Sequence, residues 1–571
     1  MGFMASPSSE MESAPLGSQR IPEENGSPSG PDGDDTSRTL TRSAGTVSIG
    51  VMVSRILGLV REQVLAYLFS ARIGLDAYYA AFRIPNLLRD MFGEGALSKA
   101  FVSTFSEIQE KEGNEAALRL VNNVLSALIL AVGAFTLAGV IYADVIVALV
   151  FPGAGFDMPL PAAESFGLAT KRELTVRLTQ IMFPFIFFVS LAALVMGVLN
   201  ARGRFLIPAL ASSFFNIGSI VVGVTGYFLA PRYGQHPTVG MAVGVLVGGA
   251  LQLLWQLPSL FRLGYRYRPV FSFRDPWLVK VMRLFGPGAL IASTVQVNLL
   301  VNSIFASRGE GWLTWIMQAF RILHLPLGLI AVAVSVATLP ALSRAAAKSD
   351  RDRFRDTFSL ATRLVIVFTV PATIGLLVLA PPIVRLIFEQ GRFGPEDTVQ
   401  VAGALRYYAV GLLSFAAVKI VTDGFYALQD IRAPLVVSVV SVASNVGLNW
   451  LFVVRLGMDH RGLALATSMT MTISLVWLWL LLRRRSEVGR LDGGRTLVTL
   501  VKTSAVSILM GAFVFATFRF LDGSYGHEIV WTRLLQVGSA IVVGCAVFVA
   551  GCKLLHVSEL DQALAALRPR R

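Results

Sequence analysis

The sequence predicts an all-α protein that crosses a membrane many times. Of its residues, 54% are apolar and only 15% are charged, and the mean hydropathy is +0.64. A soluble protein carries about a quarter charged residues. The apolar residues form separate runs, each near the roughly 20 residues that a helix needs to cross a bilayer. Basic residues gather between alternate runs, as the positive-inside rule expects.

These runs number about 14, with ends uncertain by about four residues. We expect them at 44–69, 76–106, 120–151, 175–200, 206–230, 238–262, 279–306, 312–340, 358–388, 400–428, 433–455, 461–482, 496–519 and 531–555. Residues 1–42 differ: they are rich in Ser, Pro, Gly, Asp and Glu. Such a segment buries too little apolar surface to fold, so we predict a disordered cytoplasmic tail.

The placement of charge gives the expected topology. Basic clusters follow the sixth, eighth and twelfth segments, at residues 262–283, 344–355 and 483–495. Connections on the opposite side, such as 307–311 and 520–530, carry few basic residues. We therefore predict a multi-pass membrane protein with both termini in the cytoplasm. The net charge of +14 is explained by these clusters, which lack the stacking aromatic residues of a nucleic-acid site.

Short motifs recur between the two halves of the chain. Ala81-Phe82-Arg83 returns as Ala319-Phe320-Arg321, and residues 201–208 are echoed by 427–434. A parallel repeat of six helices is a transporter architecture in which substrate lies between the halves. We expect an N-lobe at 43–270, a C-lobe at 271–485, and two additional helices with a C-terminal tail at 486–571. Duplication for structural reasons alone is the alternative.

Ionisable residues lie within the expected spans, where each arginine costs about 2.5–3.5 kcal/mol. The set comprises Arg55, Arg61, Asp76, Arg83, Arg89 and Arg321. Arg55 could simply pair with Asp76 or Glu62. Arg61 and Arg89 could extend to the membrane surface. Arg321 has no carboxylate in its own span. Because Arg83 and Arg321 are related by the repeat, we expect them to face one cavity, where guanidinium groups suit a diphosphate.

A bend is expected in the second span at Pro85-Asn86, with Glu94 at a further flexible point. No phosphate-binding loop or zinc motif is present, and the five histidines are scattered. We therefore predict a transporter without a cofactor, and we consider an enzyme acting on polyprenyl phosphate a remote alternative.

Three stretches in the first half of the chain resemble a known family. They are residues 54–62, 76–89 and 92–102, and residues 319–340 and 424–434 add to the match in the second half. The family is that of the MurJ/MviN lipid II flippases. The resemblance implies the fold of the multidrug/oligosaccharidyl-lipid/polysaccharide (MOP) exporter superfamily. It also implies transfer of the undecaprenyl-diphosphate-linked peptidoglycan precursor to the outer leaflet by alternating access, alongside cell-wall synthesis machinery. A related exporter of another lipid-linked oligosaccharide, or a drug/cation antiporter, is the alternative.

The same resemblance implies that the cavity arginines and Asp76 bind substrate. Some family members bind sodium through carboxylates in the seventh and eleventh spans. In this chain we compare Asn302, Asn445 and Asn449 with those positions. Neutral amides are poorer ligands for a hard cation, so coupling to a monovalent cation stays open beside coupling to membrane potential.

Overall fold

The computed structural model describes residues 50, 52–71, 73–92, 96–485, 493–526 and 529–567. The expected tail at 1–42 and the expected flexible residue Glu94 lie outside this part of the chain. The described part is helical, and its β-structure is limited to one isolated bridge between Pro159 and Thr170. The predicted all-α class is confirmed.

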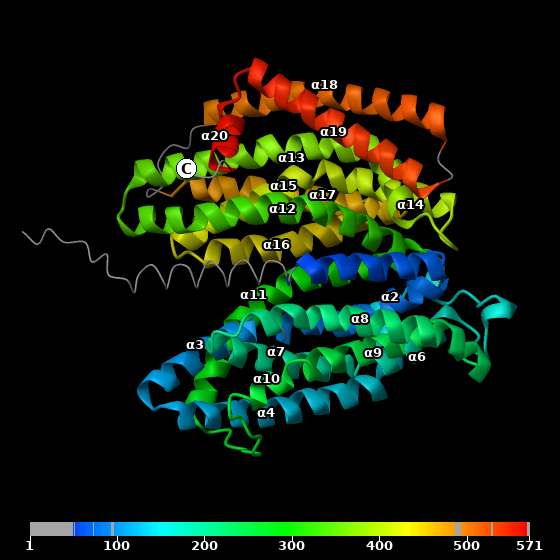
Figure 1. Ribbon diagram of the computed structural model, residues 1–571, viewed down its shortest axis with the longest axis vertical. Coiled ribbons are helices and arrows are strands. Elements are labelled where there is room, and N and C mark those ends of the chain that lie inside the picture. The colour runs from blue at the N-terminus through cyan, green and yellow to red at the C-terminus, as the bar shows by residue number, and fades with distance from the viewer. Residues whose placement is uncertain are drawn as a thin grey trace, which may run out of the picture.

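The helices form two lobes (Figure 1). The first lobe holds a helix over residues 52–68, followed by α2 (Ile73–Phe92), α3 (Ala96–Lys111), α4 (Asn114–Ile141), α5 (Ala143–Val150), α6 (Lys171–Met182), α7 (Phe185–Ala201), α8 (Leu206–Leu229), α9 (Thr238–Leu254) and α10 (Leu257–Phe261). α11 (Pro276–Ala306) packs against both α3 and α16 and so touches both lobes.

The second lobe is built from the remaining helices. They are α12 (Trp312–Ala347), α13 (Arg351–Phe388), α14 (Pro395–Val410), α15 (Leu412–Ala427), α16 (Arg432–Asn449), α17 (His460–Arg483), α18 (Gly493–Tyr525), α19 (Val530–Leu554) and α20 (Ser558–Leu567). The two added helices α18 and α19 pack on α13 at the outer side of this lobe, as Figure 1 shows. The exact lobe boundaries stay a prediction.

Ten helices among the described residues are long and apolar enough to cross a membrane. The pair α14 and α15, bent by 44°, is an eleventh candidate span. The other three expected segments coincide with the helix at 52–68, with α2 and α3 together, and with α11. A chain of many spans is confirmed, whereas the count of about 14 stays a prediction.

Capping residues set where several helices begin. Asp275 precedes α11, and its Oδ1 accepts hydrogen bonds from the backbone of Trp277 and Leu278 at 2.8 and 3.1 Å. Asp350 precedes α13 and accepts from the backbone N–H of Arg353 at 3.0 Å. These side chains satisfy backbone donors that have no partner within the helix. Both capping residues lie in the basic connections, so α11 and α13 each begin within a charged stretch of the chain.

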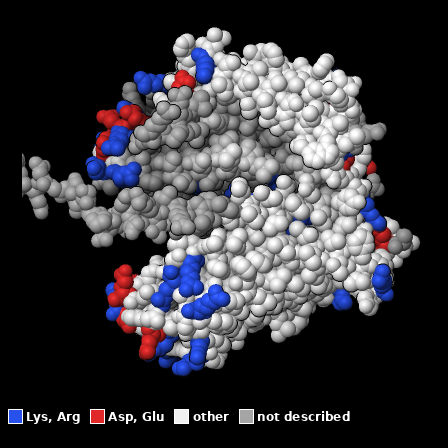
Figure 2. Space-filling view, in the orientation of Figure 1, with Lys and Arg blue, Asp and Glu red and all other residues white. Residues whose placement is uncertain are grey.

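The lobes meet at one end and separate at the other. The largest buried cluster joins Leu75 and Phe151 of the first lobe to Leu313, Phe388 and Val401 of the second. At the opposite end, Figure 2 shows the surface hollowed between the lobes, with basic side chains visible inside the hollow. Lys, Arg, Asp and Glu gather at that same end and again at the opposite end, while the surface between shows few of them (Figure 2) and exposes many large apolar side chains. Such a band of apolar surface between charged ends fits a bilayer.

Candidate functional site

A cavity of about 290 Å³ lies between the lobes. Its lining comprises Arg83 and Asn86 of α2, Leu299 and Asn302 of α11, Ile316, Met317, Phe320, Arg321 and His324 of α12, Tyr408 of α14 and Thr467 of α17. The two arginines related by the sequence repeat thus line one cavity from opposite lobes. That part of the sequence interpretation agrees with the structure. No carboxylate stands among these lining residues, so the ionised groups of the cavity wall are cationic.

A buried ion cluster holds Arg321 in place. Its guanidinium pairs with Glu62 of the first helix, which is 1% exposed. Arg61 Nη2 donates to the same carboxylate oxygen at 2.9 Å, and the Tyr79 hydroxyl donates to the other oxygen at 2.5 Å. Two guanidinium groups share one carboxylate, so the cluster keeps one net positive charge. Sequence reasoning considered Glu62 only as a partner for Arg55 and missed this role.

Arg61 is 9% exposed and therefore does not extend to the membrane surface. Its guanidinium carbon lies 5.2 Å from the ring centre of Phe215 and 5.9 Å from that of Phe82. Cation–π contacts of this kind help to offset the loss of hydration. Arg61 acts from behind the cavity wall: it fixes Glu62, which in turn fixes Arg321.

Arg83 connects α2 to the other side of the cavity. Its Nη2 donates to the backbone carbonyl of Leu299 in α11 at 3.2 Å. Arg55 is exposed and is not among the residues that line the cavity; a Cβ added to Gly328 of α12 would lie 3.9 Å from its Nη1. Arg89 lies in the last turn of α2 and is not among the residues that line the cavity.

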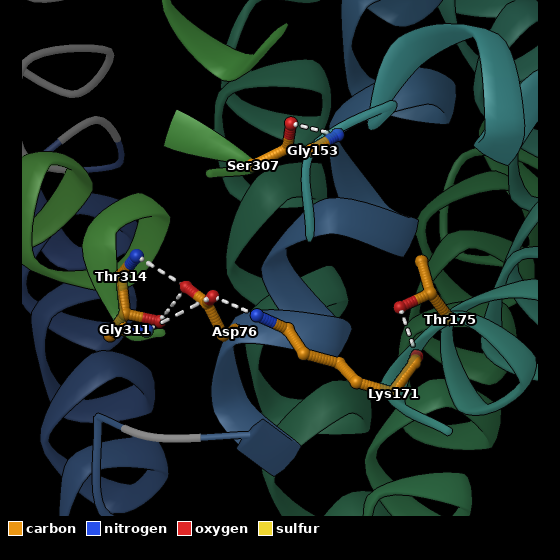
Figure 3. Close-up of polar contacts among 7 residues, drawn as sticks. All are labelled: Asp76, Gly153, Lys171, Thr175, Ser307, Gly311 and Thr314. Carbon is orange, nitrogen blue, oxygen red and sulfur yellow. Dashed lines mark hydrogen bonds and ion pairs between the residues drawn. The ribbon is translucent and has the colours of Figure 1, made fainter. Parts of the chain in front are cut away.

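Asp76 lies elsewhere, at the end where the lobes meet. It is fully buried and pairs with Lys171, which is also fully buried (Figure 3). Its Oδ1 accepts from the backbone N–H and the hydroxyl of Thr314 at 2.8 and 3.0 Å, and its Oδ2 accepts from the N–H of Gly311 at 3.3 Å. The expectation that Asp76 serves the cavity is not supported by this geometry. Asp76 instead fastens α2 to the start of α12.

Further contacts close this end of the molecule. Gly153 donates its N–H to Ser307 Oγ at 2.8 Å, as Figure 3 shows. The Trp315 indole donates to Asp397 Oδ1 at 3.1 Å, and the Arg392 N–H donates to the carbonyl of Tyr67 at 3.0 Å. The Arg392–Tyr67 bond thus joins the backbones of the two lobes directly. The cavity is sealed at this end and lies toward the basic end.

The three asparagines compared with a sodium site form a buried amide network in the second lobe. Asn449 Nδ2 donates to Asn302 Oδ1 at 2.9 Å and to Asn445 Oδ1 at 3.0 Å. Asn302 Nδ2 donates in turn to the Thr467 hydroxyl at 3.0 Å. Two amide oxygens are thus used within the network, and Asn449 Oδ1 is the one that accepts no hydrogen bond. A single free neutral oxygen is a poor site for a hard cation, which favours several charged or carbonyl ligands.

The expected bend residues lie in α2 or just beyond it. α2 continues as one helix through Pro85, and the bend expected there stays a prediction. Asn86 lines the cavity. Glu94 cannot be placed because it lies outside the described residues. Across the described part of the chain, no three His, Cys, Asp or Glu side chains are arranged to hold a metal ion.

A cationic cavity between two helical lobes, sealed at one end, suits an anionic group that enters from the other end. Comparison with known proteins agrees with this geometry. A family model described as lipid II flippase MurJ matches residues 65–535. The chain belongs to the MurJ family.

Individual MurJ relatives cover most of the chain. A lipid II flippase MurJ of Burkholderia cenocepacia is 34% identical over 451 residues, which span 78% of this chain and 84% of the relative. The MurJ relative of Vibrio cholerae is 36% identical over 438 residues, spanning 76% of this chain and 81% of its own length. These matches confirm the family resemblance drawn from the sequence motifs.

Solved structures give the same result for the fold. A lipid II flippase MurJ in an inward closed conformation is similar with a TM-score of 0.72 and 26% identity, over 90% of this chain and 99% of that one. An inward-facing multidrug transporter of the MOP superfamily has a TM-score of 0.63 at 15% identity, over 80% of this chain and 98% of its own. The latter similarity concerns the fold alone.

Proposed function

We propose that this chain is a lipid II flippase, which carries the intact undecaprenyl-diphosphate-linked peptidoglycan precursor from the inner to the outer leaflet of the bacterial cytoplasmic membrane. The observation that carries the proposal is the cavity between the lobes, where Arg83 and Arg321 stand on opposite walls. A guanidinium group stays charged at every working pH and can donate two parallel hydrogen bonds to two phosphate oxygens. Family membership supports the same substrate, because the relatives are named for it.

The charge of the cavity argues against the alternative of a drug/cation antiporter. A cationic substrate would be bound best by carboxylates, and Glu62 is already neutralised by two arginines. A related exporter of another lipid-linked oligosaccharide would use the same diphosphate chemistry. It would differ in the sugar and peptide that the cavity accepts, which a transport assay separates.

The orientation of the protein in the membrane follows from the charge distribution. The basic connections lie at the end where the cavity is hollowed (Figure 2), and the positive-inside rule assigns that end to the cytoplasm. Both termini are then cytoplasmic in our proposal, and the substrate enters from the inner leaflet. Opening of the opposite end, where Asp76 and Thr314 now hold the lobes together, completes alternating access. Contact with the cell-wall synthesis machinery is part of this proposal.

Complementation tests the function. The gene is expressed in a bacterium depleted of its own lipid II flippase, and growth is scored for the wild type and for Arg321→Ala. We expect the wild type to rescue growth and Arg321→Ala to lose rescue at equal expression. Arg344→Ala is the matched control, because Arg344 lies on the same helix but is exposed in the basic connection, so it should rescue normally.

Arg321→Lys separates charge from folding. It keeps a cation beside Glu62 but loses the paired phosphate contact, so we expect a folded protein with weaker rescue. A wild-type chain that is well expressed and never rescues would favour the related exporter. Normal rescue by Arg321→Ala would overturn the cavity as the binding site.

A further inference from the structure

His324 lies in the cavity wall but has no role in the site described so far. It lies one turn after Phe320 on α12 and is exposed to the cavity. Its Nδ1 is 2.9 Å from the backbone carbonyl of Phe320. A carbonyl oxygen can only accept, so Nδ1 must carry a hydrogen atom and donate it. The ring centres of Phe320 and His324 lie 4.2 Å apart with an angle of 68° between the ring planes. This edge-to-face contact restricts the orientation of the imidazole.

This hydrogen bond determines what the other ring nitrogen can do. A neutral imidazole carries one N–H, and here that hydrogen is on Nδ1. Nε2 then carries a lone pair and no hydrogen atom. In this form Nε2 repels a phosphate oxygen. It can donate to a phosphate only after taking up a proton.

The charged groups around His324 oppose that proton in the empty cavity. Arg321 shares its helix and is paired with Glu62 of the first helix, whose carboxylate is also shared by Arg61. Arg83 lines the same cavity from α2, and Arg55 lies beside α12 one turn further on. The groups that α11 and α17 place in the cavity wall are neutral, and α14 contributes the Tyr408 phenol. Because Glu62 neutralises only one of its two arginines, the charge around His324 stays positive, and a further cation there is unfavourable by like-charge repulsion. A bound diphosphate reverses the sign of the local charge and favours the imidazolium.

We propose that His324 binds the substrate diphosphate as an imidazolium, so that docking takes up one proton and release returns it. The inference rests on the proposed function and extends it. The proton comes from the buffered bulk solvent and goes to Nε2, and no bond of the substrate forms or breaks. Nε2–H then donates to a phosphate oxygen beside the guanidinium groups of Arg83 and Arg321. Substrate affinity becomes linked to pH through one residue.

Calorimetry on the full chain in lipid nanodiscs tests this link. Lipid II is titrated between pH 6 and pH 8 in two buffers with different ionisation enthalpies, which counts the protons taken up. We expect the wild type to take up more protons than His324→Gln, with the difference approaching one proton where free His324 is neutral. The affinity of the wild type, relative to His324→Gln, should fall by up to about tenfold per pH unit as pH rises. Comparing the two proteins removes the titration of the diphosphate itself.

Two further variants make the test specific. His324→Arg places a permanent cation at the position and should bind without the extra proton uptake. His556→Asn is the matched control at an exposed histidine outside the cavity; its φ of 52° is one that asparagine accepts, and its proton count should equal that of the wild type.

The outcomes separate this inference from the proposed function. Equal proton uptake by the wild type and His324→Gln, with both binding lipid II, would overturn the role of His324 and leave the flippase intact. Absence of lipid II binding by the wild type at every pH would instead overturn the proposed function. Loss of the extra proton in His324→Gln, with an unchanged melting temperature, supports the inference.

Discussion

Lys171 neutralises Asp76 at the sealed end of the molecule, and both side chains are fully buried. The ammonium group also lies 4.1 Å from the centre of the Phe156 ring. Lys171 stands at the first position of α6, where the helix dipole disfavours a cation, so its position depends on Asp76. Asp76 in turn accepts from Thr314 and Gly311 of the other lobe. One ion pair thus supports the contact that closes this end.

Breaking this pair should cost far more stability than breaking a surface pair. We expect Lys171→Met to destabilise the protein by about 3–5 kcal/mol, because it leaves a buried carboxylate without its cation. The double variant Asp76→Asn with Lys171→Met should recover much of that loss. Thermal unfolding in detergent micelles measures both.

Arg172→Ala is the matched control in the next residue. Arg172 pairs with Asp157 at 2.6 Å, but the carboxylate is 58% exposed, so its loss should cost at most about 1 kcal/mol. If Lys171→Met and Arg172→Ala lowered the stability equally, burial of the Lys171–Asp76 pair would not add to its contribution.

A glycine contact at the sealed end should control how closely the lobes approach. A Cβ at Gly153 would lie 2.5 Å from the backbone of Ser307, so Gly153→Ala must push the lobes apart there. We expect longer distances between spin labels placed across this seam. Gly394→Ala is the control, because its Cβ meets open space and its φ is −96°. An unchanged distance distribution in Gly153→Ala would contradict a rigid seam.

The amide network predicts that this protein gains no stability from sodium. The wild type should melt at the same temperature in NaCl and in KCl of equal ionic strength. Restoring carboxylates with Asn302→Asp and Asn449→Asp together should make melting sodium-dependent, since a bound ligand at 100 times its Kd adds about 2.7 kcal/mol. Asn298→Asp controls for added charge alone, because Asn298 lies one turn before Asn302 on α11 and donates to Ser441 rather than to the network. Specific stabilisation of the wild type by sodium would contradict this interpretation.

His236, in the connection before α9, predicts a loss of stability in acid. Burial lowers the pKa of His236 to about 4, with Arg392 adding to the effect. The unfolded chain binds a proton near the ordinary pKa of about 6.5, so stability falls as pH drops from there toward 4. His236→Gln should flatten the fall in unfolding temperature over this range. Identical pH profiles for the two proteins would exclude His236 as the titrating group.

Local sequence was sufficient for some parts of the site. The recurring Ala-Phe-Arg motif correctly placed Arg83 and Arg321 on one cavity, because equivalent positions in a parallel repeat face the same interface. Glu62 was missed, although it follows Arg61 directly and its charge inside an apolar span was a usable signal. His324 was passed over as one of five scattered histidines, and only the cavity lining and the bond to Phe320 gave it meaning.

The sequence by itself determined the helices, the many membrane spans and the cationic character of the interior, because these depend on hydropathy and charge along short stretches of chain. Tertiary structure decided which charges meet. Asp76 and Glu62 are both acidic residues near arginines in the sequence, yet one pairs with Lys171 at the sealed end and the other with Arg321 beside the cavity. Those partners lie far apart along the chain, and their meeting depends on helix rotation and lobe approach, which local pattern does not encode.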